Sequence, residues 1–162
     1  MQKKTSSRHI MKNFHDLDIL INKVKRPLVF TNGVFDILHR GHIEYLNEAK
    51  KLGNTLLVAL NSDESVKSLN KGANRPINKL EDRIYILSNL IAIDLITSFN
   101  DSTPIKLIER LKPDFLIKGG DWLEDDIVGS RFVKKIGGKV FSIPFKTDIS
   151  TTKIINKIIL ST

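Results

Sequence analysis

Two histidines and a glycine, in the segment His39-Arg40-Gly41-His42, are the residues whose types and spacing most directly suggest chemistry. An apolar run that ends in Asn32-Gly33 precedes them, and a helical pattern begins at Gly41. A helix start carries unpaired N–H groups and a partial positive charge, so it attracts anions, and a glycine there lets a phosphate approach the backbone. The segment therefore predicts phosphoryl or nucleotidyl transfer, with a pair of structural histidines as the alternative.

Length and composition are those of one globular domain. The chain has 162 residues, of which 41% are hydrophobic and 27% are charged, and it contains no cysteine. We find no apolar run of about 18 residues and no signal-peptide pattern, so we expect a cytoplasmic protein without a membrane partner. Any metal must be held by oxygen or imidazole, because there is no thiolate.

The positive charge is concentrated near the start of the chain. The net charge is +8, and residues 1–26 carry seven basic against two acidic residues, a net +5. No five basic residues are consecutive, which favours a solvated lysine-rich surface and no nucleic-acid partner. Attraction of polyphosphate substrates and a nucleic-acid-binding module are the alternatives.

Apolar runs alternate with helical patterns along the chain. We expect an irregular tail over residues 1–12, a leading helix from Phe14 to Val24, and one domain over residues 27–162, with residues 1–26 as its leading segment. The predicted strands are Leu28–Thr31, Thr55–Leu60, Asp94–Phe99, Phe115–Lys118 and Lys139–Ile143. The predicted helices start near Gly41, Glu64, Leu80, Thr103, Ile127 and Thr151. This alternation predicts an α/β fold, a Rossmann-like three-layer sandwich with a parallel five-stranded sheet.

Candidate binding residues follow the carboxyl ends of four predicted strands. In parallel sheets ligands bind at that edge, where the strand order reverses, so these turns should surround one nucleotide pocket. The nucleotide-binding candidates are Thr31, Asn32, Gly33, Phe35, Asp36, Gly41, Asn61, Asp63, Lys118, Gly119, Asp121, Ser150, Thr151 and Thr152.

A polar loop over Asn70–Lys79 supplies basic candidates. We expect Lys71 and Arg75 to clamp substrate phosphates as part of the catalytic machinery with His39 and His42, and Arg83 to contact the nucleotide. A solvated basic side chain is the alternative for each of them. Asp36 could orient a histidine, cap a turn, or hold Mg²⁺ through water.

These motifs together resemble one known family. The ordered set T-N-G-V-F-D, H-R-G-H, N-S-D, R-P, K-G-G-D-W and I-S-T-T-K-I is similar to the cytidylyltransferase-like nucleotidyltransferases, and within them to the heptose 1-phosphate adenylyltransferases. The resemblance covers about residues 28–159. It implies transfer of AMP from ATP to a heptose 1-phosphate, with Mg²⁺, giving ADP-heptose and pyrophosphate for lipopolysaccharide precursors. No covalent enzyme intermediate is implied.

The resemblance also assigns roles to the motif residues. His39 and His42 would stabilise the transition state at the α-phosphate, and Ser150–Thr152 would hold the β- and γ-phosphates at a second helix start. Asp36, Arg75 and Trp122 would contact the acceptor, although a lone tryptophan could also belong to the core. A homo-oligomer is expected, and since no sugar-kinase domain precedes this one, a separate heptose kinase is expected to supply the acceptor.

Three differences from related sequences indicate which members of the family this chain resembles. Glycerol-phosphate cytidylyltransferases have R-T-E-G before I-S-T-T, whereas this chain has Phe145 at the matching place. Their turn reads G-D-D-W, while K-G-G-D-W is closer to the heptose enzymes. Val34 replaces a cysteine often found in the heptose enzymes, a small apolar exchange. CTP-dependent transfer to glycerol 3-phosphate or another alcohol phosphate remains the alternative.

Overall fold

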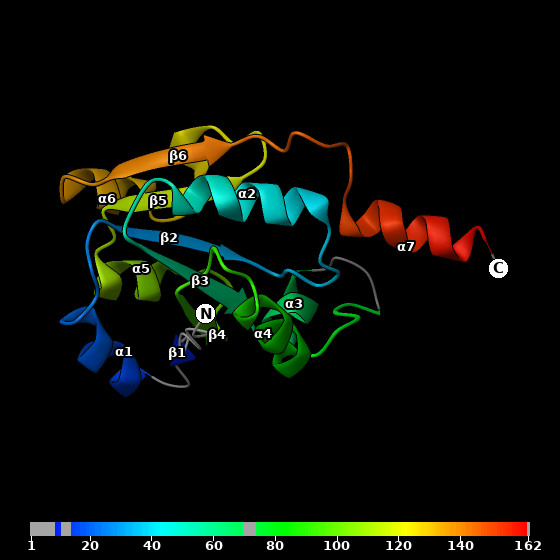
Figure 1. Ribbon diagram of the computed structural model, residues 1–162, viewed down its shortest axis with the longest axis horizontal. Coiled ribbons are helices and arrows are strands. Elements are labelled where there is room, and N and C mark those ends of the chain that lie inside the picture. Colours follow the sequence, from blue (N-terminus) through cyan, green and yellow to red (C-terminus); the bar gives the residue numbers. More distant parts are fainter. Residues whose placement is uncertain (1–8, 11–13, 70–73, 162) are drawn as a thin grey trace, which may run out of the picture.

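A parallel sheet forms the centre of the protein. The computed structural model describes residues 9–10, 14–69 and 74–161. Its six strands lie in the order β1-β4-β3-β2-β5-β6, all parallel, with helices on both sides (Figure 1). The strands are β1 (His9–Ile10), β2 (Leu28–Gly33), β3 (Thr55–Asn61), β4 (Leu95–Phe99), β5 (Phe115–Gly119) and β6 (Lys139–Ile143).

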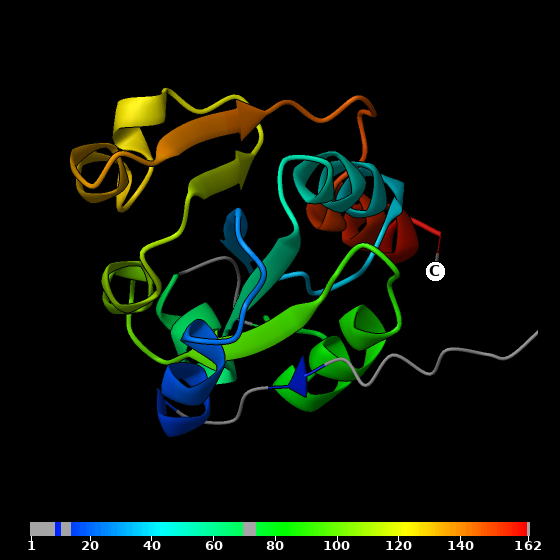
Figure 2. The same cartoon turned by 60° about the vertical axis from the view of Figure 1, so that its left-hand side comes forward.

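Helices cover the two faces of this sheet in separate layers. Residues of α1, α5 and α6 pack in one core cluster, and residues of α2 and α4 pack in the other (Figure 2). Such a layered arrangement buries both faces of a parallel sheet, as the apolar strand sequences require. The helices are α1 (Phe14–Ile21), α2 (Arg40–Lys50), α3 (Asp63–Ser68), α4 (Leu80–Ser88), α5 (Ile105–Leu111), α6 (Ser130–Lys135) and α7 (Thr151–Ile159), with a 3-10 turn η1 at Glu124–Asp126.

Alternation along the strands assigns each side chain to a face. In β2, Leu28 and Phe30 belong to the cluster under α1, α5 and α6, whereas Val29 belongs to the cluster under α2 and α4. All three side chains are completely buried. The three-layer α/β fold predicted from the sequence is confirmed.

Three details differ from the sequence-based predictions. The expected irregular tail contains β1, which pairs with β4 at Leu95–Ile96 and adds a sixth strand at the sheet edge. The leading helix ends at Ile21 rather than Val24. The helix expected from Ile127 begins only at Ser130, because Gly129 before it has φ = 90°, a left-handed conformation that interrupts a right-handed helix.

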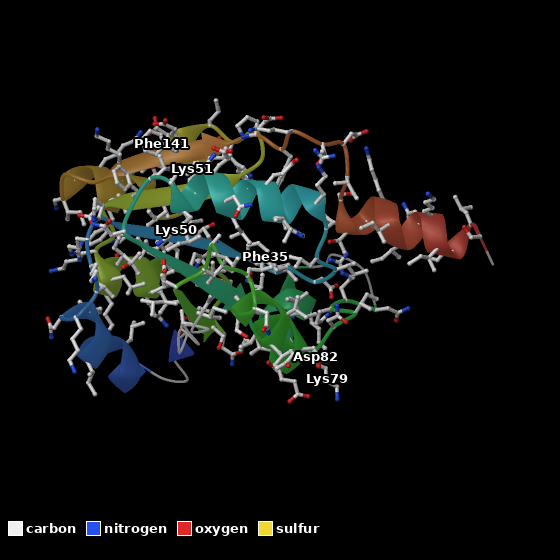
Figure 3. The ribbon with its side chains drawn as sticks, in the orientation of Figure 1. Phe35, Lys50, Lys51, Lys79, Asp82 and Phe141 are labelled. Atoms are coloured by element: carbon white, nitrogen blue, oxygen red, sulfur yellow. The ribbon has the colours of Figure 1, made fainter. Side chains whose placement is uncertain are left out.

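The order of the strands places a binding edge between β2 and β5. The chain runs outward from β2 to β3 and β4, then returns to β5 on the other side of β2, which makes the carboxyl ends of β2 and β5 the switch point. The N-terminal end of α2 lies at this edge, while Lys50 and Lys51 mark its opposite end (Figure 3). The last helix, α7, extends beyond the N-terminal end of α2 (Figure 1).

The helices of the described ranges are short, and none of them is long and apolar enough to cross a membrane.

Candidate active site

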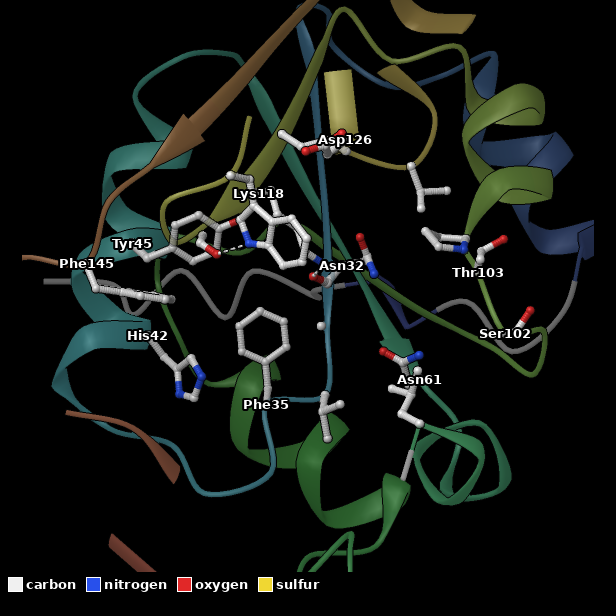
Figure 4. Close-up of a pocket in the computed structure, with 18 residues that line it drawn as sticks. Asn32, Phe35, His42, Tyr45, Asn61, Ser102, Thr103, Lys118, Asp126 and Phe145 are labelled. Atoms are coloured by element: carbon white, nitrogen blue, oxygen red, sulfur yellow. Dashed lines mark hydrogen bonds between the residues drawn. The ribbon is translucent and has the colours of Figure 1, made fainter. Parts of the chain in front are cut away.

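A cavity of about 430 Å³ opens at the switch point (Figure 4). It runs along the carboxyl ends of the central strands, so backbone turns from distant parts of the sequence form its wall. The lining residues are Asn32, Gly33, Val34, Phe35, His42, Tyr45, Asn61, Leu69, Ser102, Thr103, Pro104, Lys118, Gly119, Trp122, Asp126, Ile127, Val128 and Phe145.

The two histidines lie in contact at the start of α2. His39 is the N-cap residue, and its carbonyl accepts the His42 N–H at 3.0 Å. Their rings stack with centroids 3.8 Å apart and an interplanar angle of 21°. Gly41 permits this packing, because a Cβ there would lie 3.2 Å from the His39 ring and 3.4 Å from Thr147 Oγ1. His42 faces the cavity.

Three buried polar atoms around this helix start have no hydrogen-bond partner among the described residues. They are His39 Nδ1, His42 Nδ1 and Thr147 Oγ1. Unsatisfied buried polar groups are costly, and in native proteins they often belong to a site that a ligand completes. The N-terminal end of α2, which is an 11-residue helix, adds unpaired N–H groups and a positive dipole end. Together these groups suit a phosphate.

Burial lowers the pKa of both imidazoles and keeps His42 neutral at pH 7. Desolvation, together with the nearby His39, lowers the pKa of His42 from 6.5 to about 4, and desolvation also lowers the pKa of His39. A neutral imidazole has one N–H. Because a buried Nδ1–H without an acceptor would cost more than a bare nitrogen, the proton is better placed on Nε2, where it can be donated to an anion.

Phe35 forms the floor under His42. The two rings lie 5.1 Å apart at 54°, and Phe35 adopts φ = 50°, a strained conformation for a bulky residue. The Phe35 ring lies against Gly33, where an added Cβ would come within 2.9 Å of ring atom Cε2. Asn32 and Gly33, which the sequence predicted as a turn, are the last two residues of β2, and the Phe35 ring occupies the space that a side chain at position 33 would need.

Asp36 does not face the cavity. Its side chain is fully buried, its Oδ2 accepts from Arg75 Nε at 2.6 Å and from the Ile77 N–H at 2.9 Å, and its Oδ1 accepts from the Asn78 N–H at 2.8 Å. Three internal hydrogen bonds hold this carboxylate, and the expectations that Asp36 contacts substrate or holds Mg²⁺ through water stay predictions. It anchors residues 75–78 of the loop.

Arg75 is held in the same ion pair. Its side chain is 11% exposed and bonded to Asp36, and it is absent from the cavity wall. The expectation that it clamps substrate phosphates is not met in this conformation, because the guanidinium is turned to the carboxylate. Lys71, the other loop candidate, lies outside the described residues.

Arg83 is a structural residue rather than a nucleotide contact. The side chain is 0% exposed, and its guanidinium donates to Val34 O at 2.8 Å, Asn61 O at 2.9 Å and Asp63 Oδ1 at 2.6 Å. It also donates to Asn78 O at 3.0 Å. The expected nucleotide contact of Arg83 is not seen, because its donors are used internally, and neither Arg83 nor its partner Asp63 lines the cavity. Arg83 thereby joins the carboxyl ends of β2 and β3.

The turn after β5 brings a cation and an aromatic ring to the cavity. Lys118 Nζ lies 5.9 Å from the centroid of the Trp122 ring and 3.5 Å from Asn32 O. Trp122 is 49% exposed, with its indole N–H donated to Gly119 O at 3.2 Å. Lys118, Gly119 and Trp122 line the cavity as expected, whereas Asp121 is exposed and does not.

The start of α7 lies beside the histidine segment but outside the cavity wall. Ser150 caps the helix by accepting the Lys153 N–H at 3.2 Å, and Thr151 Oγ1 donates to Ile37 O at 3.3 Å. Thr152 is exposed. The predicted closeness of two helix starts is therefore present through the Thr151–Ile37 contact, while the role of Ser150–Thr152 toward phosphates stays a prediction.

Thr31 does not line the cavity but is hydrogen-bonded to Tyr45, which does. It is buried, and its hydroxyl is hydrogen-bonded to the hydroxyl of Tyr45, which also donates to Ile117 O at 3.3 Å. Burial raises the pKa of Tyr45. Tyr45 lines the cavity with its ring 6.0 Å from that of Phe145, edge to face. Neither Tyr45 nor Phe145 was predicted as a pocket residue.

Sequence reasoning also missed the wall opposite the histidines. Ser102, Thr103 and Pro104 follow β4, and applying the strand-end rule to that strand as well would have found them. Asp126, Ile127 and Val128 gave no such signal, because only the packing of η1 brings them to the cavity.

Magnesium is implied by the family resemblance, and its place in the site stays a prediction. No group of three or more His, Asp or Glu residues among those the structure describes could hold a metal. The one predicted carboxylate, Asp36, is occupied by hydrogen bonds.

Comparison with known proteins agrees with this geometry. Residues 30–157 match the Cytidylyltransferase-like family. The chain is 49% identical over 140 residues to the D-beta-D-heptose 1-phosphate adenylyltransferase of Bordetella bronchiseptica, covering 86% of each chain. It is 50% identical over 131 residues to the bifunctional protein HldE of Alcanivorax borkumensis, covering 81% of this chain but only 27% of that protein.

Solved structures show the same fold. A lipopolysaccharide core biosynthesis protein from Thermoplasma volcanium matches with 31% identity and a TM-score of 0.61, over 75% of this chain and 98% of the other. A pantoate-beta-alanine ligase from Francisella tularensis matches with 18% identity and a TM-score of 0.64, over 94% and 78%, which concerns the fold alone. With its histidine pair at a helix start on the switch-point edge, this chain belongs to the cytidylyltransferase-like family of nucleotidyltransferases.

Proposed function

We propose that the protein transfers AMP from ATP to the phosphate of a heptose 1-phosphate, releasing pyrophosphate and forming ADP-heptose. The observation that carries the proposal is the group of buried polar atoms without a hydrogen-bond partner at the start of α2, which are His39 Nδ1, His42 Nδ1 and Thr147 Oγ1. They lie beside the cavity at the carboxyl ends of β2 and β5. The chemistry of the acceptor comes from the relatives, of which the Bordetella bronchiseptica protein is named a heptose 1-phosphate adenylyltransferase.

The reaction needs no nucleophile from the protein. An oxygen of the acceptor phosphate attacks the α-phosphorus of ATP in line, the new oxygen–phosphorus bond forms, and the bond between the α-phosphorus and the bridging oxygen breaks as pyrophosphate leaves. The protein must hold two anions together and stabilise the charge that builds up on the equatorial and leaving oxygens.

The residues of this chain suit that task. The N–H groups of the first turn of α2 and Nε2 of His42 supply donors at the cavity, and Lys118, which also lines it, supplies a positive charge. His39 stacks on His42 and fixes its ring plane. Ser150–Thr152, at the start of α7, would receive the β- and γ-phosphates. Mg²⁺ would arrive with ATP and neutralise phosphate charge when bound.

Phe145 favours this reading over a glycerol-phosphate cytidylyltransferase. It replaces the arginine found at the matching place in those enzymes, and its ring lies at the cavity against Tyr45. Pyrophosphate release measured for ATP and CTP, each with heptose 1-phosphate and with glycerol 3-phosphate, tests the proposal. We expect turnover with ATP and heptose 1-phosphate, and turnover only with CTP and glycerol 3-phosphate would overturn it.

A homo-oligomer is part of the proposal, supported by α7. The nine-residue helix has no buried residue, although four isoleucines lie along one side of it, Ile154, Ile155, Ile158 and Ile159. An isolated helix this short is unstable in water, so this apolar side needs a cover. A second copy of the chain would provide it and would fix Ser150–Thr152 at the site. A cytoplasmic location and supply of the acceptor by a separate kinase stay predictions.

A further inference from the structure

The chain between β6 and α7 passes the N-terminal end of α2 (Figure 1). Lys146 in this segment pairs with Glu48 of α2 at 3.4 Å, and Thr151 at the start of α7 donates to Ile37 O. Thr147 lies between these two anchors, and its Oγ1 atom is buried without a hydrogen-bond partner among the described residues. The segment therefore brings a hydroxyl group to the histidine motif from a distant part of the sequence.

Thr147 Oγ1 and His39 Nδ1 border the same small space over Gly41. A Cβ at Gly41 would lie 3.2 Å from His39 Nδ1 and 3.4 Å from Thr147 Oγ1. Both atoms are buried, and neither has a hydrogen-bond partner within the part of the chain that the structure describes. A hydroxyl group can donate to a bare imidazole nitrogen, so each of the two groups supplies what the other lacks. Gly41 leaves this space open, whereas a side chain at position 41 would fill it.

His39 and Thr147 stand behind the cavity wall, while His42 is part of it. His39 acts on His42 through the stack of their rings, whose centroids are 3.8 Å apart. A histidine ring can turn over about its Cβ–Cγ bond, and a neutral one can carry its proton on either nitrogen. A donor at Nδ1 selects one of these states, because only the bare nitrogen can accept from it.

We infer that Thr147 is a positioning residue for the nucleotidyl transfer. Its hydroxyl donates to Nδ1 of His39, directly or through one water molecule, which keeps the His39 proton on Nε2 and fixes the ring against His42. His42 is thereby held at the cavity from behind. The kinetic consequence of this hydrogen bond rests on the proposed function, whereas the hydrogen bond itself does not.

Nitrogen-15 NMR of the His39 ring tests the hydrogen bond without any substrate, at about pH 8, where imidazole is neutral. An unprotonated ring nitrogen resonates at a lower shift when it accepts a hydrogen bond. We expect that signature at Nδ1 in wild type and in Thr147→Ser, and its loss in Thr147→Val. Asp148→Asn is the matched control, because the neighbouring Asp148 side chain is exposed and pairs with Lys153, and it should match wild type.

Steady-state kinetics test the positioning role. Thr147→Val should lower kcat with ATP and heptose 1-phosphate about 3- to 10-fold, which is the worth of one hydrogen bond expressed as a rate. KM for both substrates should stay at the wild-type value, because Thr147 does not line the cavity. Thr147→Ser should restore kcat. Thr147→Ala, which also lacks the hydroxyl and adds no bulk, should behave as Thr147→Val and replaces it if that variant does not fold.

An Nδ1 shift that is the same in wild type and in Thr147→Val, or a protonated Nδ1 in wild type, would overturn the inference. So would wild-type kcat in the folded variants that lack the hydroxyl. A raised KM for ATP as their main effect would also overturn it, because Thr147 would then contact the nucleotide itself. If wild type shows no turnover with ATP and heptose 1-phosphate while the Nδ1 shift still responds to Thr147, the proposed function fails and the hydrogen bond stands.

Discussion

The imidazole of His39 lies flat on that of His42, with ring centroids 3.8 Å apart and both Nδ1 atoms buried without a hydrogen-bond partner among the described residues. Only His42 borders the cavity. One ring is therefore placed to meet substrate, and the other determines where the first one points. This division of labour separates the expected effects of changing each histidine.

Replacement of His42 by Ala should reduce kcat about 10²- to 10³-fold, because a donor to the transition state is lost. His39→Ala should reduce kcat less, because His39 does not line the cavity. Pyrophosphate release and thermal melting of both variants check this. Wild-type activity in a folded His42→Ala variant would contradict the assigned role.

The lowered pKa of His42 predicts a pH-dependent stability. The folded protein holds this group with a pKa of about 4, against 6.5 ordinarily, so the unfolded chain binds more protons between those values. The contribution is complete above pH 6.5 and is lost as pH falls toward 4. We expect the free energy of unfolding of wild type to fall by about 3 kcal/mol more over this window than that of His42→Gln.

Denaturant unfolding at several pH values between 7 and 4 measures that difference. Other titrating groups are common to both proteins, so the difference isolates His42. Parallel curves for the two proteins would show that the imidazole is not held neutral by burial.

Arg83 should affect stability rather than substrate affinity. Its buried guanidinium bonds to Asp63 and to the carbonyls of Val34 and Asn61, so Arg83→Met should lower the free energy of unfolding by about 3–5 kcal/mol. Arg110→Met is a matched control, because the Arg110–Asp18 pair is exposed and such pairs are worth at most about 1 kcal/mol. A stable Arg83→Met protein with a raised KM for ATP would instead support the expected contact of Arg83 with the nucleotide.

Gly33 should resist substitution because of Phe35. An alanine Cβ would lie 2.9 Å from the Phe35 ring, which in turn contacts His42, so Gly33→Ala should cost about 1–3 kcal/mol and reduce kcat. Adding Phe35→Leu removes the clash, and the double variant should be more stable than the sum of the single effects. Additive effects would contradict the packing explanation.

The apolar side of α7 should mediate self-association. Ile158→Glu places a charge on that side, where the isoleucine is 57% exposed in the single chain, and should convert oligomer to monomer in sedimentation analysis. Asn156→Glu, on the polar side of the same helix, is the control and should leave the oligomer intact. A wild-type protein that is monomeric at all concentrations would overturn the oligomer proposal.

The layered fold could be predicted because the pattern of apolar residues within each strand and helix depends only on neighbouring residues. Each central strand begins with an apolar run, and most helices have a recognisable start or stop, so the strands were found near their observed places and the bounds of β6 coincide with the prediction. The two-residue β1 carries no such pattern. It exists because the edge of β4 offers free hydrogen-bonding groups, which no local property of His9–Ile10 encodes.

The sequence by itself determined the family, the histidine pair at a helix start, and the turns that meet at one edge, because motif order and apolar periodicity depend on neighbouring residues. Only the tertiary structure decided how each polar side chain is used. The charges of Arg83 and Asp36 are the same whether these residues bind substrate or other protein groups. In the folded chain both are buried, and Arg83 pairs with Asp63 while Asp36 pairs with Arg75. Thr147 lies beside the ring of His39 only because the chain after β6 packs against the start of α2, a contact between residues far apart in the sequence.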